Sequence, residues 1–471
     1  MDRASALDSA FLQIEDAHSS LHIASVAIFE GPPPSQEAIL EAIGRRLALA
    51  PRLRQRLLAV PFGLGRPVWA DDPDFDLRRH VRRVGVPAPG GDEQLHDVVD
   101  TILSEHLDHE LPLWEDVVID GLPDDRWALV TKVHHTMADG IAGTDLLSTI
   151  LETTPRPRRM PQPVPWSPPP RPGRTRLLAG AVRDQALLRA RELRSASASI
   201  GGALHPRTLA DTAVQTGRGL LGYAEAGVPL SPSSLVGPLG SDRSFRWTEA
   251  DLGEVLRAHS RLGGTVNDLV LAVVTHAFRA LLLARGEEPA PNAVRCLVPV
   301  SVRSEGARGV LDNQVSALLA TLPVELEDAR DRLNEVAIRM RALKSSHEAD
   351  AGERLIRFAD ALPPAAVTGF LHLAFRTPHR NLTTVTTNVP GPTRQLFLAG
   401  RPMLTAYPFV PIADRLRLGV AVTTYQGRLL FGVTCDRQST PDVAVFVAAL
   451  DAALAELLSL ARVSQPKGVT P

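Results

Sequence analysis

Apolar residues are spaced along the chain in two ways that predict different elements. Recurrence at every third or fourth position predicts amphipathic helices, and this spacing marks residues 37–50, 141–151, 252–262, 267–285, 328–345 and 441–460. Short runs rich in β-branched residues predict strands, and such runs occupy residues 127–133, 294–300, 315–324, 383–388, 416–425 and 428–435. Both kinds of element occur in each half and no tandem repeat is visible, which predicts an α/β (α+β) fold in two halves.

A proline-rich segment divides the chain. Nine of the 18 residues in 155–172 are proline, a density that excludes helix and sheet interiors and favours an extended linker. The predicted organisation is an N-terminal subdomain, a linker with a helical connector, a C-terminal subdomain and a short tail, at residues 1–154, 155–235, 236–464 and 465–471.

The connector at residues 174–203 combines arginine with leucine and alanine in a helical pattern. Two interpretations stay open. The helix packs on the body of the protein, or it forms a basic amphipathic surface that contacts anionic lipid.

Charge and cysteine content narrow the class of protein. The 471 residues include 51 Lys and Arg against 53 Asp and Glu, a formal net charge of −2. Overall charge therefore offers no attraction for nucleic acid, and we expect no nucleic-acid partner. Cys296 and Cys435 lack the spacing of a metal site or disulfide framework and are predicted to be buried thiols.

The sequence predicts a cytoplasmic protein. Residues 1–22 lack a basic region followed by an apolar run, so no signal peptide is expected. The apolar segments 269–284 and 443–460 are short or interrupted by charged side chains, which predicts that neither spans a bilayer. Any membrane contact is expected to be peripheral, on the inner membrane face or on lipid droplets.

The strongest chemical signal is an HHxxxDG motif at the end of a predicted strand, His134-His135-Thr136-Met137-Ala138-Asp139-Gly140. Successive strand side chains point to opposite faces, so only one of the two histidines is expected to face a cavity. Neutral imidazole accepts protons near pH 7 and can assist a hydroxyl in attacking an activated acyl group. We predict that His135 is the catalytic general base and that His134 is either an assisting group or a structural hydrogen-bonding residue.

Asp139 follows His135 by four residues. One interpretation is a His–Asp dyad in which the carboxylate fixes the imidazole tautomer. The other, which we favour, is structural: the carboxylate pairs with an arginine and caps the following helix. Gly140 then allows a sharp turn of the backbone.

Motifs of other reaction classes are absent from the sequence. It contains no Walker-type or GxGxxG fingerprint, no GxSxG elbow and no catalytic-cysteine signature. The adjacent histidines lack the i, i+4 spacing of a helical zinc pair. We therefore predict no nucleotide hydrolysis, no dinucleotide cofactor, no serine or cysteine nucleophile and no metal site.

Seven short segments outside the motif form a set: LDSAFL at 7–12, LHI at 21–23, PRLRQRL at 51–57, PLW at 112–114, ND at 267–268, PVSVR at 299–303 and NVPGP at 388–392. With these segments the chain resembles the bacterial wax ester synthase/acyl-CoA:diacylglycerol acyltransferase (WS/DGAT) family. That family is one of the HHxxxDG acyltransferases, with chloramphenicol acetyltransferase and the condensation domains of peptide synthetases. One departure is Val236, where the family usually has Asn.

The resemblance implies two chloramphenicol-acetyltransferase-like subdomains with a channel at their interface. Acyl-CoA would enter from one side and the acceptor alcohol from the other, and they would meet at His135 without a covalent acyl-enzyme. Acyl-CoA is then a co-substrate and no resident cofactor is expected.

Four further residues are assigned to the surroundings of the site. Asn267 could donate its amide N–H to the oxyanion that forms on the thioester carbonyl, or it could cap a helix, a position that Asp268 favours as well. Arg303 is the candidate partner of Asp139 across the two halves, with an unpaired surface arginine as the alternative. Trp114 is expected to pack under the site rather than to touch substrate.

Three hypotheses follow for function. The leading one is an acyltransferase that moves a long-chain acyl group from acyl-CoA to diacylglycerol, giving triacylglycerol, or to a fatty alcohol, giving wax ester. The second is a condensation-type transferase that takes its acyl group from a carrier protein. The third is a catalytically silent homologue that binds lipid or lipid droplets through the arginine-rich connector.

Overall fold

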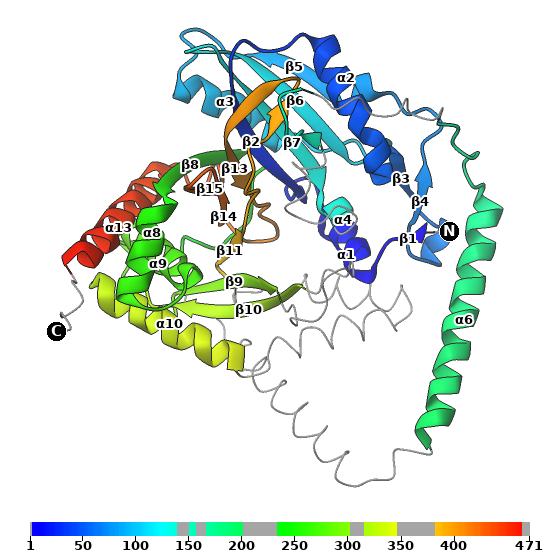
Figure 1. The fold of residues 1–471 in the computed structure, drawn as a ribbon. Coiled ribbons are helices and arrows are strands. Elements are labelled where there is room, and N and C mark those ends of the chain that lie inside the picture. Colours follow the sequence, from blue (N-terminus) through cyan, green and yellow to red (C-terminus); the bar gives the residue numbers. More distant parts are fainter. Residues whose placement is uncertain are drawn as a thin grey trace, which may run out of the picture.

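The computed structural model describes residues 2–138, 150–156, 166–200, 233–301, 315–345 and 382–463. Within these residues two six-stranded mixed sheets carry the fold (Figure 1). The N-terminal sheet has the order β12 (Phe397–Leu398), β13 (Arg401–Phe409), β2 (His22–Glu30), β7 (Arg126–His134), β6 (Trp114–Leu122), β5 (Val81–Gly85). The C-terminal sheet has the order β10 (Val315–Leu322), β9 (Val294–Ser301), β11 (Thr384–Val389), β14 (Leu418–Tyr425), β15 (Arg428–Asp436), β8 (Arg243–Asp251).

A small third sheet lies beside the N-terminal half and joins β1 (Asp2–Arg3), β4 (Val68–Asp71) and β3 (Gln55–Leu58). The helices of the N-terminal half are α1 (Ala6–Ile14), α2 (Gln36–Arg46), α3 (Asp92–Ser104) and α4 (His135–Ala138), with 3₁₀ turns η1 (Leu47–Leu49), η2 (Pro51–Arg54), η3 (Pro61–Gly63) and η4 (Leu77–Arg79). The connector forms α6 (Arg174–Ile200), and the C-terminal half adds α8 (Leu252–Leu262), α9 (Val266–Ala284), α10 (Ala329–Ser345) and α13 (Val443–Val463).

Most of the predicted elements are confirmed to within a few residues. The predicted helices at 252–262, 267–285, 328–345 and 441–460 correspond to α8, α9, α10 and α13, and the helix at 37–50 ends earlier, at Arg46, before a 3₁₀ turn. The six predicted strands correspond to β7, β9, β10, β11, β14 and β15. The predicted helix at 141–151 lies almost entirely outside the described residues.

Four long strands were not predicted: β2, β6, β8 and β13. Of the four, β13 is the hardest to predict from sequence. Pro402 and Pro408 lie inside it, and proline normally argues against a strand interior. The strand tolerates them with an irregular register between Met403 and Thr405. Periodicity alone could not recover such a strand.

Strand β13 also connects the two halves. It belongs by sequence to the predicted C-terminal subdomain, yet it pairs antiparallel with β2 of the N-terminal sheet. Its side chains Met403, Tyr407 and Phe409 are buried in the N-terminal core together with Trp127 and Phe29. The N-terminal sheet is therefore completed by C-terminal chain, which fixes the two halves to each other.

The C-terminal core is built around α9. This helix begins with a capping box, in which Thr265 caps and Asp268 returns a hydrogen bond, and it buries most of its residues against α10 and α13. By length and hydropathy alone, α9 and α13 are each long and apolar enough to cross a membrane, although the sequence predicts that these segments are too short or too charged. In the fold they pack against each other, with 67% and 39% of their most apolar windows buried.

Candidate active site

The two motif histidines lie where β7 ends and α4 begins. The backbone N–H of His134 donates to the carbonyl of Leu113, at 2.9 Å, and that of His135 donates to the carbonyl of Leu21, also at 2.9 Å. Two other segments of the chain thus hold the junction between β7 and α4 by backbone hydrogen bonds. Because the strand stops at His134, the simple alternation expected for two strand residues does not extend to His135.

Helix α1 places two side chains against these histidines. A capping box starts the helix: the Asp8 N–H donates to Ser5 Oγ and the Ser5 N–H donates to Asp8 Oδ2, each at 2.9 Å. The helix then presents Phe11, whose ring centroid lies 4.1 Å from that of His135. It ends at Glu15, its C-cap residue, which reaches His134.

His134 is fully buried and both of its ring nitrogens are engaged. The backbone N–H of Thr136 donates to Nδ1 at 3.2 Å, and the hydroxyl of Thr136 lies 2.9 Å from the same atom. Nδ1 therefore acts as an acceptor, so the ring proton is on Nε2, which donates to Glu15 Oε2 at 3.1 Å. An imidazole held in this way has no lone pair free for substrate, which favours the structural interpretation of His134.

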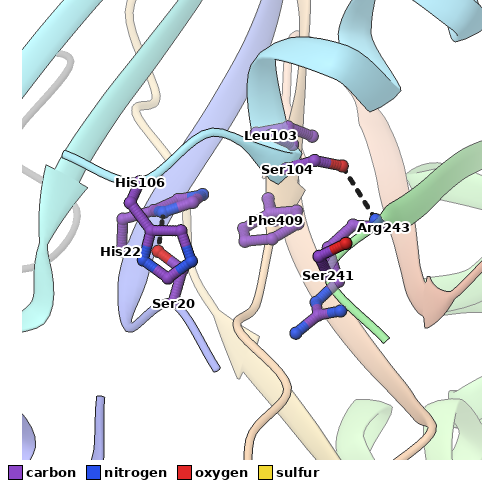
Figure 2. Close-up of a pocket in the computed structure, with 8 residues that line it drawn as sticks. All are labelled: Ser20, His22, Leu103, Ser104, His106, Ser241, Arg243 and Phe409. Atoms are coloured by element: carbon purple, nitrogen blue, oxygen red, sulfur yellow. Dashed lines mark hydrogen bonds between the residues drawn. The ribbon is translucent and has the colours of Figure 1, made fainter. Parts of the chain in front are cut away.

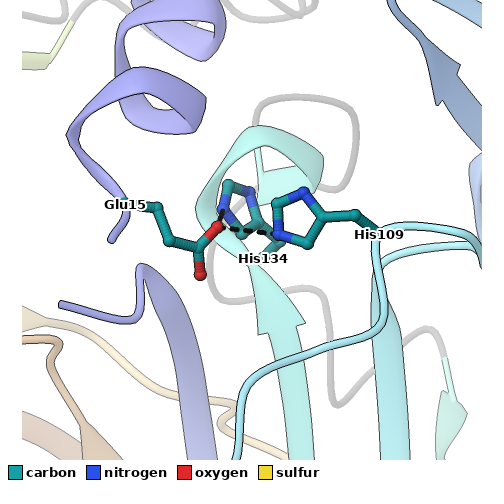
Figure 3. Close-up of side chains that lie close together, drawn as sticks. All are labelled: Glu15, His109 and His134. Atoms are coloured by element: carbon teal, nitrogen blue, oxygen red, sulfur yellow. Dashed lines mark hydrogen bonds and ion pairs between the residues drawn. The ribbon is translucent and has the colours of Figure 1, made fainter. Parts of the chain in front are cut away.

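Glu15 also binds a second histidine (Figure 3). His109 Nε2 lies 2.9 Å from Glu15 Oε2, and His106 Nδ1 lies 3.7 Å from Oε1. Burial by itself would raise the pKa of Glu15, but the hydrogen bonds from His109 and His134 hold that pKa well below its usual range. The hydrogen bond to Glu15 raises the pKa of His109 in turn. The carboxylate is thus fully ionised beneath the motif.

One nitrogen of His134, one of His109 and an oxygen of Glu15 lie within 4.8 Å of one another, close enough to hold a metal ion. A metal on Nε2 of His134 would require the proton on Nδ1, where the Thr136 N–H already donates. The donor set therefore fits a hydrogen-bond network better than a metal centre.

His135 has a different environment. Its side chain is half-buried, and Nδ1 has no hydrogen-bond partner among the residues that the structure describes. Burial, and then the proximity of His134, lowers the pKa of His135 to about 4. The ring is therefore neutral at physiological pH and has a lone pair that can accept a proton.

Trp114 is 2% exposed and sits at the start of β6. Its Nε1 donates to the carbonyl of Leu53 at 2.7 Å, and its ring stacks on His80 with centroids 4.6 Å apart. The PLW and PRLRQRL segments thus contact each other directly, and Trp114 is a packed residue of the core next to the motif strand.

Asn267 lies in the first turn of α9 and does not cap it, because Thr265 does. Asp268 completes the capping box, with its Oδ2 accepting from the Thr265 N–H at 2.8 Å. The Oδ1 of Asn267 accepts from Asn388 Nδ2 at 3.4 Å, so the structure brings the ND segment to the NVPGP segment. No hydrogen bond within the described residues joins Asn267 to His135.

Three predicted site residues lie outside the described residues: Asp139, Gly140 and Arg303. The proposed Asp139–Arg303 pair across the halves stays a prediction. Val236 is described; it forms an isolated bridge with Leu416.

A small hollow lies where the two halves meet (Figure 2). It is lined by Ser20, His22, Leu103, Ser104 and His106 of the N-terminal half, by Phe409 at the end of β13, and by Ser241 and Arg243 at the start of the C-terminal half. His22 is hydrogen-bonded to Ser20 through Nδ1, at 2.6 Å, and burial lowers its pKa. In the register of the sheet, His22 pairs with His134.

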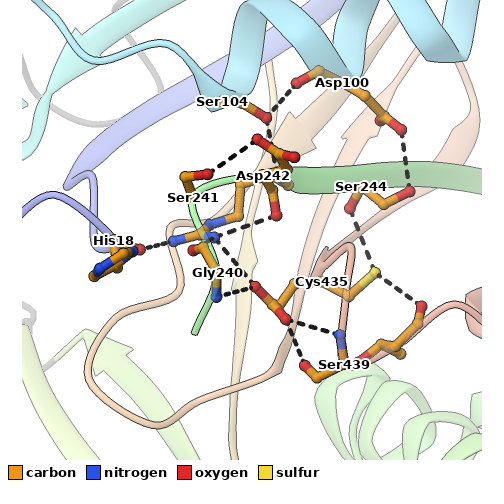
Figure 4. A network of polar contacts seen from close by, with 12 residues as sticks. His18, Asp100, Ser104, Gly240, Ser241, Asp242, Ser244, Cys435 and Ser439 are labelled. Atoms are coloured by element: carbon orange, nitrogen blue, oxygen red, sulfur yellow. Dashed lines mark hydrogen bonds and ion pairs between the residues drawn. The ribbon is translucent and has the colours of Figure 1, made fainter. Parts of the chain in front are cut away.

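A polar network that the sequence did not reveal joins the halves beside this hollow (Figure 4). Asp100 of α3 is 1% exposed and accepts from the Phe245 N–H at 2.7 Å and from Ser244 Oγ at 3.1 Å. The Arg243 N–H donates to Ser104 Oγ at 2.8 Å. The sequence signal would have been a carboxylate among the apolar residues of an amphipathic helix, but α3 was not predicted from the sequence.

Comparison with known families gives a consistent result. The family description "Wax ester synthase/diacylglycerol acyltransferase catalytic domain" matches residues 4–270, and "WS/DGAT C-terminal domain" matches residues 311–458. A Mycobacterium tuberculosis protein described as "Probable diacyglycerol O-acyltransferase tgs1" is 38% identical over 475 residues, which cover 98% of this chain and 97% of that protein.

Solved structures agree on the fold. The wax ester synthase/diacylglycerol acyltransferase from Marinobacter aquaeolei VT8 is similar at a TM-score of 0.68 and 25% identity, covering 98% of this chain and all of that one. The first condensation domain of the calcium-dependent antibiotic synthetase is similar at a TM-score of 0.56 and 17% identity, over 98% and 96% of the two chains. The predicted two-subdomain fold of the HHxxxDG acyltransferases is confirmed.

Proposed function

Because the chain belongs to the wax ester synthase/diacylglycerol acyltransferase family, we propose that it moves a long-chain fatty acyl group from acyl-CoA to diacylglycerol, to a fatty alcohol, or to both. Membership in this family identifies the protein as an O-acyltransferase. The observation that carries the finer proposal is the contrast between the two motif histidines: His134 has both nitrogens engaged, while His135 is neutral and has an unpartnered nitrogen within the described residues.

In the proposed reaction His135 accepts the proton of the acceptor hydroxyl as its oxygen attacks the thioester carbonyl carbon. The tetrahedral intermediate then expels the thiolate of coenzyme A, and the His135 imidazolium returns the proton to that sulfur. Because its pKa is lowered, the His135 ring is neutral at physiological pH and its lone pair is free to accept the proton. The reaction requires no resident cofactor, because the acyl group arrives activated as a thioester.

Asn267 is the proposed donor to the oxyanion. Its Oδ1 accepts from Asn388 Nδ2 at 3.4 Å, which leaves its own Nδ2 available as a donor. Donors of this kind contribute roughly 3–4 kcal/mol to transition-state stabilisation where they have been removed. Asn267→Ala is then expected to lower kcat rather than to raise KM.

We propose that the enzyme works in the cytoplasm, and that it contacts lipid peripherally because its proposed acceptors are apolar.

The test is a coenzyme A release assay with palmitoyl-CoA and dioleoylglycerol, hexadecanol or no acceptor. Wild type, His135→Ala and the matched control His259→Ala, on the distant helix α8, are run in parallel. Acceptor-dependent thiol release that is lost only in His135→Ala supports the proposal and ranks the two acceptors. Folded wild-type protein that releases no thiol with either acceptor would refute it and point to a carrier-protein donor or to lipid binding without catalysis.

A further inference from the structure

Exposed apolar side chains lie on a loop at the outer side of the N-terminal half and on the helix next to it. Phe62, at the tip of the loop that contains η3, is 88% exposed, and Leu64 is 46% exposed. Val182 and Leu187 of α6 are 62% and 52% exposed. Phe62 also adopts a φ of 61°, a backbone conformation that is unfavourable for a bulky residue. A large apolar side chain that is exposed to water on a constrained turn does not stabilise the fold.

The loop and the helix form one surface, which we call the η3–α6 face and define as residues 61–64 and 174–187. Gln185 Nε2 donates to the carbonyl of Leu64 at 2.7 Å. Beneath them Leu177 and Ala181 pack on Val60 and Val68 in a small separate core. In Figure 1, α6 runs along the outside of the molecule, away from both large sheets, with its first turns beside β3 and β4.

The same face is positively charged. Arg174, Arg176 and Arg183 are exposed on α6. The acidic residue of this segment, Asp184, pairs with Arg3 at 2.5 Å and with Arg183 at 3.6 Å, so the segment keeps a net positive charge. Along its sequence α6 contains six arginines against two acidic residues. Exposed apolar side chains together with exposed arginines are the combination that binds anionic interfaces.

We propose that the η3–α6 face docks the protein on an anionic phospholipid bilayer, with Phe62 and Leu64 inserted among the acyl chains and the arginines on the headgroup phosphates. The inference rests on the proposed function only for the choice of a lipid as partner. Docking would bring the enzyme to the lipid phase in which an apolar acceptor is dissolved.

The test measures binding without turnover, by co-sedimentation of the full chain with vesicles. Wild type is expected to bind phosphatidylcholine vesicles containing 30% phosphatidylglycerol far more tightly than pure phosphatidylcholine, and to lose affinity as salt rises. Phe62→Asp should weaken binding by about tenfold or more; Asp tolerates positive φ, so the turn is preserved. The triple change of Arg174, Arg176 and Arg183 to Gln should weaken it about 100-fold, near fivefold for each arginine.

The matched control is Ile338→Asp, which alters an exposed apolar side chain of α10, 54% exposed, and should bind like wild type. Equal binding to neutral and anionic vesicles, or equal loss in Phe62→Asp and Ile338→Asp, would overturn the proposal. So would a wild-type dimer that becomes a monomer in Phe62→Asp, because the face would then serve a second copy of the chain.

A second assay separates this inference from the proposed function. Hexanoyl-CoA and hexanol, used in solution without vesicles, should be turned over equally by wild type and by both sets of η3–α6 variants. If wild type turns over neither these substrates nor palmitoyl-CoA with either long-chain acceptor, the proposed function is refuted and the binding result stands. Loss of it in the variants alone shows that the face acts on the active site rather than on lipid.

Discussion

Strands β7 and β15 occupy interior positions in the two large sheets, and each ends in polar residues, but the two ends are used differently. At the end of β15, Asp436 is 1% exposed; its Oδ1 accepts from the Gly240 N–H at 2.7 Å and its Oδ2 from the Ser439 N–H and hydroxyl at 2.9 and 2.6 Å. The neighbouring Cys435 is buried, which raises the pKa of its thiol to about 12. The carboxylate that ends this strand is therefore hydrogen-bonded through both oxygens, and the thiol beside it is inert.

At the end of β7 the polar groups are satisfied only in part. His134 is fixed by Thr136 and Glu15, whereas His135 keeps an unpartnered nitrogen within the described part of the chain. A satisfied buried group stabilises a turn, and an unsatisfied titratable group next to a rigid one is suited to chemistry. The difference between the two strand ends therefore distinguishes a structural turn from a candidate catalytic centre.

The largest effect is expected from His135→Ala. Removal of the base should lower kcat by about 10²–10⁴-fold, the usual contribution of general-base catalysis, while the melting temperature stays close to that of wild type. Steady-state kinetics and thermal unfolding measure the two quantities. Activity near that of wild type would show that the two strand ends do not differ in the way we describe.

Asp436→Ala should lower the stability of the fold and leave the activity unchanged. The change leaves three donors without their charged acceptor, and each such hydrogen bond contributes roughly 1.5–3 kcal/mol. We expect the free energy of unfolding to fall by about 3 kcal/mol or more, measured by urea titration, with kcat/KM of the folded fraction unchanged. A specific loss of kcat without destabilisation would contradict a purely structural role.

Glu15→Gln tests whether activity depends on the hydrogen bond that holds His134. Two charge-assisted hydrogen bonds, from His134 and His109, become weaker, and a loss of about 1.5–3 kcal/mol corresponds to roughly a tenfold to hundredfold fall in kcat. KM should change little, because Glu15 is a positioning residue and does not touch substrate. Glu110→Gln, an exposed change nearby, is the matched control. A wild-type kcat in Glu15→Gln would show that His134 needs no anchor.

The pH profile tests the pKa of His135. Because folding lowers that pKa from 6.5 to about 4, kcat/KM should remain high at pH 5.5, where a base with the ordinary pKa would have lost about tenfold. The same shift makes His135 stabilise the fold fully above pH 6.5 and progressively less as the pH falls toward 4. An acid limb centred near 6.5 in soluble-substrate assays would refute the lowered pKa.

The smallest effect is expected from removal of metal. If Glu15, His109 and His134 form a hydrogen-bond network, dialysis against EDTA should change neither kcat nor the melting temperature. Loss of activity that Zn²⁺ restores would instead make this cluster a metal site.

Much of this protein was predictable from local patterns. The periodicity of α9 and the apolar run of β7 identified both elements because burial of one face imposes a repeat on neighbouring residues. The HHxxxDG motif located the candidate site, and the short family segments identified the fold.

Only the tertiary structure could show which distant groups meet. Glu15 reaches His134 across 119 residues, and Asp100 reaches Phe245 across 145. Likewise, β13 crosses from the C-terminal chain into the N-terminal sheet. Local sequence determines which face of an element is apolar, but the partner of a buried polar group is set by how the elements pack. The sequence therefore determined the elements and the motif, and packing decided which histidine is anchored and which remains available.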